Sequence, residues 1–197
     1  MSEIDVFNNN KLPELTHRQR KIVLGCLFGK GCIVKPPGNR NCYMCIRQSK
    51  REDINILAYK AAELKDFGRT KAVIEDKNSI KWYSATHSVW NEFYKLCYKN
   101  NKKRLSEEWL DGLSSSSFAM MFLDLARERK DFCLGLNISS FLKQKKLLLK
   151  YFEEVDLKCN IEKTRLVFDR TTTDKFLKII YQDVPEYLVY RIQQYIP

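Results

Sequence analysis

Hydrophobic and polar positions divide residues 15–104 into a helix, a hairpin, a second helix, a second hairpin and a third helix. The first helix begins after Thr16, a favoured N-cap residue, and ends near the glycines at 29–31. The apolar face of the second helix, predicted at 52–67, consists of Ile54, Leu57, Ala58, Ala61 and Leu64. The other expected elements are a helix capped by Ser88 and strands at 32–35, 41–49, 71–75 and 80–86.

Alternate residues of the 41–49 strand form two different faces. Met44 and Ile46 lie on an apolar face, whereas Tyr43, Cys45 and Arg47 lie on a more polar one. This pattern is typical of an antiparallel sheet that is covered by helices on one side only.

Residues 105–197 show the same order of elements. The predictions are an apolar helix at 118–124, a strand at 132–138, a helix to about 155, a hairpin at 159–169 and a last helix capped by Thr172 or Thr173. We therefore predict an α+β fold with two pseudo-symmetric α-β-β-α-β-β-α halves, at 15–104 and 105–197. Their antiparallel sheets should form a saddle, and residues 1–14 should form a flexible N-terminal arm.

Two glycines lie four positions apart in the first helix, at Gly25 and Gly29. On a helix this spacing makes a smooth stripe against which another backbone can pack closely. The expected partner is the 118–123 helix, which approaches through Ala119. These three residues should form a helix-pair interface between the halves.

Charge is distributed unevenly along the chain, whose net charge is +11. Residues 1–104 contain 21 Lys and Arg against 10 Asp and Glu, while residues 105–197 contain 14 of each. A localised basic excess indicates a polyanion partner, most often a nucleic acid. The neutral second half could contact protein or serve as scaffold. This asymmetry favours one side of a structured RNA over a symmetric grip on double-stranded DNA.

Several classes of protein and site are disfavoured by the sequence. No long uncharged apolar run predicts a membrane helix, and the N-terminus has neither a secretory signal nor an organellar presequence. Seven scattered cysteines predict reduced thiols inside a cell. The C-x-x-C at Cys42 and Cys45 lies in an extended segment that sends the two side chains to opposite faces. With only His17 and His87 elsewhere, we predict no metal site.

Two segments resemble the paired signatures of the LAGLIDADG homing endonucleases: Leu24–Gly31 and Phe118–Ala126. The similarity runs from about 15 to 191 and includes the segments 46–51, 82–88, 93–103, 137–141 and 185–191. The resemblance implies a single-chain fold of two halves that places two sheets in the DNA major groove. It also implies Mg²⁺-dependent cleavage by the last acidic residue of each signature. Some relatives act as maturases, which help introns to fold.

The sequence departs from the family at those acidic positions, which Lys30 and Leu125 occupy. Asp124 matches an earlier aspartate of the signature, which is usually structural. Because neither lysine nor leucine can coordinate Mg²⁺, we predict no catalytic residues and no cofactor. Lys30 could instead place a fixed positive charge against the phosphate backbone.

The binding surface is predicted to be retained, through cations that contact phosphates or bases and tyrosines that stack on bases. The candidate nucleic-acid-binding residues are Lys30, Lys35, Arg40, Tyr43, Arg47, Lys71, Lys81 and Tyr83, together with Asn137, Lys163 and Arg165.

Three hypotheses stay open. The first is a non-cleaving RNA-binding protein, either a maturase-like folding factor or a structural component of an RNA–protein particle such as an organellar ribosome. The second is an active, Mg²⁺-dependent endonuclease in which Glu128 or Asp131 replaces the lost acids. The third is a DNA-binding regulator that does not cleave. The resemblance also implies a mitochondrial or other organellar location.

Overall fold

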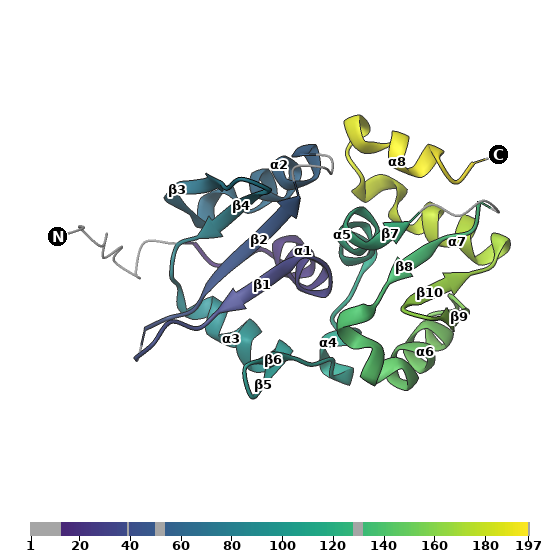
Figure 1. The fold of residues 1–197 in the computed structure, drawn as a ribbon, viewed down its shortest axis with the longest axis horizontal. Helices are drawn as coiled ribbons and strands as arrows, with labels where there is room; N and C mark the ends of the chain where they lie inside the picture. The colour runs from purple at the N-terminus through teal and green to yellow at the C-terminus, as the bar shows by residue number, and fades with distance from the viewer. Residues whose placement is uncertain (1–12, 39, 50–53, 128–131, 197) are drawn as a thin grey trace.

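The computed structural model describes residues 13–38, 40–49, 54–127 and 132–196 (Figure 1). The predicted arm at 1–14 lies almost entirely outside the described residues. The relocated acids of the endonuclease hypothesis, Glu128 and Asp131, lie outside them as well.

The first half has the predicted order of helices and strands. Its elements are α1 (His17–Phe28), β1 (Gly31–Val34), β2 (Tyr43–Ser49), α2 (Ile54–Glu63), β3 (Gly68–Glu75), β4 (Ser79–Ser84) and α3 (Ser88–Cys97). The strands form one antiparallel sheet in the order β1-β2-β4-β3. Thr16 caps α1 as predicted, and it forms a capping box with Gln19.

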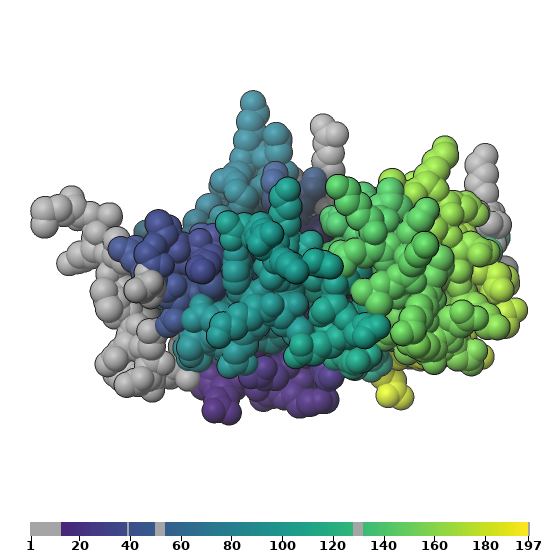
Figure 2. All heavy atoms as spheres, turned by 90° about the horizontal axis from the view of Figure 1, so that it is seen from below, coloured from purple at the N-terminus to yellow at the C-terminus, as the bar shows by residue number. Residues whose placement is uncertain are grey.

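The second half repeats this arrangement. Its elements are α5 (Ser115–Leu125), β7 (Ala126–Arg127), β8 (Gly135–Asn137), α6 (Lys145–Glu154), β9 (Cys159–Glu162), β10 (Arg165–Phe168) and α7 (Arg170–Ile180). The sheet order β7-β8-β10-β9 matches that of the first half strand for strand. The predicted α+β fold of two pseudo-symmetric halves is therefore confirmed. In Figure 2 the ends of the β3–β4 and β9–β10 hairpins project from the same side, as the walls of a saddle do.

Short elements connect and complete the halves. They are the hairpin of β5 (Tyr98–Lys99) and β6 (Lys102–Lys103), helices α4 (Glu107–Asp111) and α8 (Tyr190–Gln193), and 3-10 turns η1 (Lys65–Phe67), η2 (Ser139–Gln144), η3 (Tyr181–Asp183) and η4 (Glu186–Leu188). The sequence interpretation missed β5, β6 and β7, because a strand of two residues shows no alternation that a periodic pattern can reveal. No helix in the described ranges is long and apolar enough to span a membrane.

Two predicted helix caps are wrong. His87, not Ser88, caps α3, and its Nδ1 accepts a hydrogen bond from the Val89 amide at 3.3 Å. Asp169 caps α7 by accepting a hydrogen bond from the Thr172 amide at 2.7 Å. The hydroxyl of Thr173 serves another purpose, since it accepts a hydrogen bond from the Leu134 amide.

The predicted apolar face of α2 is also partly wrong. Ile54 and Ala58 are exposed, whereas Tyr59 and Lys60 are buried with Leu57. The helix is turned relative to the hydrophobic pattern because an ion pair, described below, draws Lys60 into the protein interior.

The central helix pair is formed by α1 and α5, as predicted (Figure 1). A Cβ atom on Gly25 would collide with the carbonyl oxygen of Ser117, and one on Gly29 would collide with Asp124. The atoms nearest to the glycines belong to Ser117, Met120 and Asp124; Ala119 is buried in the same helix but contributes none of them. The glycines therefore allow the two backbones to meet where the halves join.

Candidate nucleic-acid interface

The open face of the first sheet carries the largest group of candidate residues. Tyr43 and Arg47 on β2 lie on the face opposite to the buried Met44 and Ile46, in agreement with the predicted alternation. Strand pairing places Cys45 of β2 opposite Tyr83 of β4. Four candidates from two strands thus share this face, since Arg47 lies opposite Lys81 in the same pairing.

Arg47 and Lys81 are like charges at directly opposed positions of neighbouring strands. Such a pair destabilises a sheet. The Lys81 ammonium forms an ion pair with Asp76, which offsets part of the repulsion, while Arg47 is exposed. The pair concentrates positive charge on the open face, where an anionic ligand would relieve the repulsion.

Aromatic rings lie next to these charges. The Tyr43 and Tyr83 rings have centroids 6.2 Å apart, and the Arg69 guanidinium lies 4.3 Å from the centroid of Tyr83. Arg69 was not among the predicted residues, because β3 begins at Gly68 rather than at 71. An irregular register between Gly68 and Val73 also prevents alternation from assigning this residue to a face.

Three more candidates lie in or beside the first sheet and are exposed: Lys35 and Arg40 in the connection between β1 and β2, and Lys71 on β3. The Lys35 ammonium lies 5.6 Å from the centroid of Tyr94. That ring stacks on Tyr98 at 4.9 Å, and both tyrosines line an open pocket of about 530 Å³. The sequence analysis did not name the two tyrosines as candidates, although Tyr98 directly follows α3 and lies four residues, about one helical turn, after Tyr94.

The second sheet brings its own candidates together and places an acidic residue beside them. Arg165 on β10 lies opposite Asn137 on β8 and, on its other side, opposite Glu162 on β9. Lys163 occupies the turn between β9 and β10, with a positive φ of 55°. In the second sheet the residues at directly opposed positions, Arg165 and Glu162, thus carry charges of opposite sign, whereas those in the first sheet, Arg47 and Lys81, carry charges of the same sign.

Asp124 lies at the centre, where the resemblance places the metal site. Its carboxylate is fully buried, forms an ion pair with the equally buried Lys60, and accepts a hydrogen bond from the Lys30 amide at 2.8 Å. Leu125 ends α5 and is half-buried. In this arrangement the oxygens of Asp124 are already committed to the two lysines.

A third lysine, Lys103, adds positive charge near the same point. Its ammonium donates hydrogen bonds to the carbonyl oxygens of Leu27, in the last turn of α1, at 2.7 Å, and of Gly31, at the start of β1. Burial lowers the pKa of Lys103. Among the described residues, no group of three or more His, Cys, Asp or Glu side chains is arranged to hold a metal ion.

A basic hollow of about 570 Å³ lies outside the two four-stranded sheets. Its described lining is Lys99, Asn100, Lys102, Lys103, Arg104, Lys143 and Gln144. The hollow lies where the halves meet, because its lining combines residues 99–104 of the first half with Lys143 and Gln144 of the second. Gln144 of η2 also exchanges hydrogen bonds with the backbone of Leu105, the residue directly after this segment. The β5–β6 hairpin (teal) faces the viewer near the middle of Figure 2. The sequence analysis did not predict this hollow.

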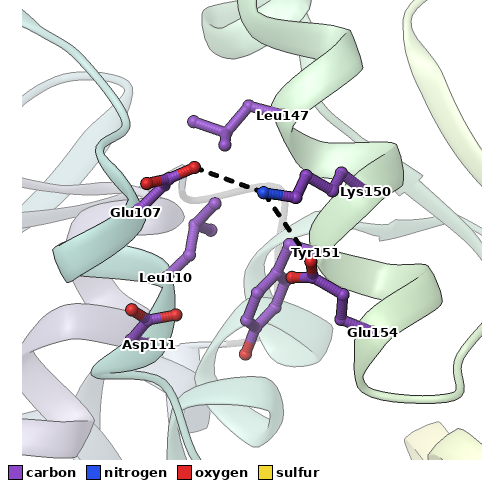
Figure 3. Close-up of a pocket in the computed structure, with 7 residues that line it drawn as sticks. All are labelled: Glu107, Leu110, Asp111, Leu147, Lys150, Tyr151 and Glu154. Atoms are coloured by element: carbon purple, nitrogen blue, oxygen red, sulfur yellow. Dashed lines mark hydrogen bonds and ion pairs between the residues drawn. The ribbon is translucent and has the colours of Figure 1, made fainter.

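The neighbouring hollow between α4 and α6 has a different character (Figure 3). It measures about 200 Å³, and its three acids are Glu107, Asp111 and Glu154. Lys150 lies between two of them, 3.4 Å from Glu107 and 3.7 Å from Glu154. Its acidic lining makes this hollow unsuitable for a phosphate backbone.

Comparisons with known proteins agree with this geometry. Residues 20–176 match the LAGLIDADG DNA endonuclease family, and no curated protein matches the chain. Three similar solved structures are the homing endonuclease I-WcaI bound to its DNA recognition sequence, mesophilic variants of the homing endonuclease I-DmoI, and full-length DUF199/WhiA from Thermatoga maritima.

The I-WcaI structure has a TM-score of 0.80 at 13% identity, over 93% of this chain and 89% of the other. The I-DmoI variants give 0.51 at 12%, over 84% and 96%. DUF199/WhiA gives 0.55 at 14%, over 93% and 62%. At these identities the similarity to solved structures concerns the fold.

Proposed function

Because the chain belongs to the LAGLIDADG DNA endonuclease family, we propose that it is a nucleic-acid-binding protein whose binding surface lies mainly on the first sheet. The observation that carries this proposal is the row of Arg47 and Lys81 beside Tyr43 and Tyr83. Cations supply phosphate contacts, and the rings supply surfaces on which bases can stack.

In this proposal the protein does not cleave its ligand. Lys30 and Leu125 supply no carboxylate at the two acidic positions of the signatures. The nearby Asp124 carboxylate is paired with Lys60. Because Lys60 compensates Asp124, the excess positive charge of this centre comes from Lys30 and Lys103. That charge repels a divalent cation and attracts phosphate, so binding needs no Mg²⁺.

Structured RNA is the ligand that we favour over double-stranded DNA. A duplex that follows both sheets would meet compensated charges on the second sheet, where Arg165 lies opposite Glu162. The basic hollow is lined by residues outside both four-stranded sheets and suits a ligand that bends around the molecule. The protein would then be a maturase-like folding factor or a component of an RNA–protein particle, with the neutral half available to protein partners. An organellar location, expected from the resemblance, belongs to the same proposal.

Double-stranded DNA is the second candidate ligand. The solved I-WcaI structure, with a TM-score of 0.80 over most of both chains, is bound to its DNA recognition sequence. A non-cleaving DNA regulator would use the same saddle. An active endonuclease would additionally need Mg²⁺ and the acids Glu128 or Asp131.

Crosslinking in cells, followed by sequencing of the bound nucleic acid, tests the ligand. We expect a defined RNA to be enriched; enrichment of a DNA site without RNA would refute the RNA proposal. Incubation of supercoiled DNA with the protein and Mg²⁺ or Mn²⁺ tests cleavage, and we expect no nicking. Specific nicking that Glu128→Gln or Asp131→Asn abolishes would establish the endonuclease instead.

A further inference from the structure

Two cysteines face one another on the open side of the first sheet. Cys32 of β1 lies directly opposite Cys45 of β2, so both side chains point to the same face. Their thiols form a hydrogen bond with each other. The C-x-x-C partner of Cys45 is not involved, because Cys42 is buried toward the helix-covered side.

Neighbouring hydrogen bonds define the kind of strand pair that the cysteines occupy. The Ile33 amide donates to the Tyr98 hydroxyl at 2.9 Å, and the Met44 amide donates to the Ser84 hydroxyl at 2.8 Å. Both amides therefore point out of the β1–β2 ladder. Because the two kinds of pair alternate along antiparallel strands, the next pair, Cys32 and Cys45, is hydrogen-bonded through its backbone.

This position sets the separation of the two cysteines. Cα atoms of a hydrogen-bonded antiparallel pair lie about 5.5 Å apart. Disulfides span Cα separations of about 4.4–6.8 Å. The Cβ atoms are wider apart than a relaxed disulfide prefers, so a bond formed here carries strain and is readily reduced.

The surroundings distinguish the two sulfur atoms. The hydrogen bond from Cys45 lowers the pKa of Cys32, with help from the nearby Lys103 ammonium. The same hydrogen bond raises the pKa of Cys45, whose thiol also contacts the Tyr83 hydroxyl. Cys32 is half-buried, whereas Cys45 is buried. These differences make Cys32 the attacking thiolate and Cys45 the resolving thiol.

We propose that Cys32 and Cys45 form a redox-active dithiol that low-molecular-weight disulfides, such as oxidised glutathione, convert to a reversible intramolecular disulfide. The Cys32 thiolate attacks one sulfur of oxidised glutathione, which forms a mixed disulfide and releases one glutathione thiolate. Cys45 then loses its proton and attacks the Cys32 sulfur, which releases the second glutathione. The two protein thiols are oxidised, one glutathione disulfide is reduced, and the two protons end on the two released glutathiones.

The matched control is Cys159, a half-buried thiol on β9 of the other sheet. It lies opposite Phe168 rather than a second cysteine. A thiol of similar exposure without a resolving partner can form at most a mixed disulfide.

The test is thiol mapping of the full chain after incubation with mixtures of reduced and oxidised glutathione. We expect alkylation of Cys32 and Cys45 to be lost together, with a peptide that joins them, and to return on addition of dithiothreitol. Cys45→Ser should instead accumulate glutathione on Cys32, and Cys159→Ser should behave as the unaltered chain does. The measurement on the unaltered chain needs no substitution, so misfolding of a variant cannot obscure it.

Glutathione retained on Cys32 as on Cys159, with no peptide that joins Cys32 to Cys45, would overturn the proposal, as would full alkylation of Cys32 and Cys45 in excess oxidised glutathione. Neither readout depends on a bound nucleic acid. The dithiol and the proposed binding function therefore succeed or fail separately.

Discussion

The two sheets share strand order and direction but differ in the charges on their open faces. In the first sheet Arg47 lies opposite Lys81, and in the second Arg165 lies opposite Glu162. Like charges destabilise a sheet, whereas opposite charges stabilise it. The opposite charges of the second sheet are therefore explained by the stability of the fold. The like charges of the first sheet reduce stability and so need another explanation, which is why we assign nucleic-acid binding mainly to the first half.

The largest effect is expected where the halves meet, at the buried ion pair of Lys60 and Asp124. Lys60→Met leaves a buried carboxylate without its counter-charge and should lower the free energy of unfolding by about 3–5 kcal/mol. Adding Asp124→Asn removes that charge and should recover part of the loss. Urea denaturation of the single and double variants measures this coupling.

Lys150→Met is the matched control for this experiment. Lys150 also pairs with acids, Glu107 and Glu154, but all three side chains are largely exposed. Its removal should leave the unfolding midpoint nearly unchanged. A loss of stability in Lys60→Met no greater than that of the control would contradict the assignment of the pair as a link between the halves.

The next largest effect is expected at the contact between α1 and α5, where the close approach of the two backbones depends on a glycine of α1. Gly25→Ala would force a methyl group against the carbonyl oxygen of Ser117 and should cost about 1–3 kcal/mol of stability. Ala119→Gly, in the facing helix, should cost only about 1 kcal/mol through helix propensity. Thermal unfolding compares the two, and an equal cost would show that the close approach at Gly25 is relaxed in solution.

A third pair of variants compares the sheets as binding surfaces. Arg47→Ala with Lys81→Ala should weaken nucleic-acid binding at least tenfold and reduce the slope of log affinity against log salt by roughly two phosphate contacts. Lys163→Ala with Arg165→Ala should weaken binding less than threefold. Titration at several salt concentrations gives both values. Equal losses from the two double variants would mean that the sheets bind symmetrically, as a DNA duplex requires.

The open face of β2 was predictable because alternation is local: Tyr43 and Arg47 follow from two-residue periodicity. Arg69 was not, because the irregular register in β3 breaks that periodicity. Lys60 was missed for another reason. Its burial depends on Asp124, 64 positions away in the sequence, so no local pattern marks it as an interior residue. The basic hollow likewise needs the contact between Gln144 and Leu105 to bring two separate segments together.

The smallest effect is expected from a substitution that makes the charges of the second sheet more like those of the first. Glu162→Gln removes the negative charge opposite Arg165 while keeping the length of the side chain. The second sheet would then resemble the first in charge, and affinity for the same nucleic acid should rise about two- to threefold, because Arg165 contributes its charge to the ligand. The free energy of unfolding should fall slightly, because the favourable pairing of opposite charges between β9 and β10 is lost. If Glu162→Gln leaves affinity unchanged while Arg47→Ala with Lys81→Ala abolishes binding, the second sheet lies away from the ligand, and its compensated charges serve the fold.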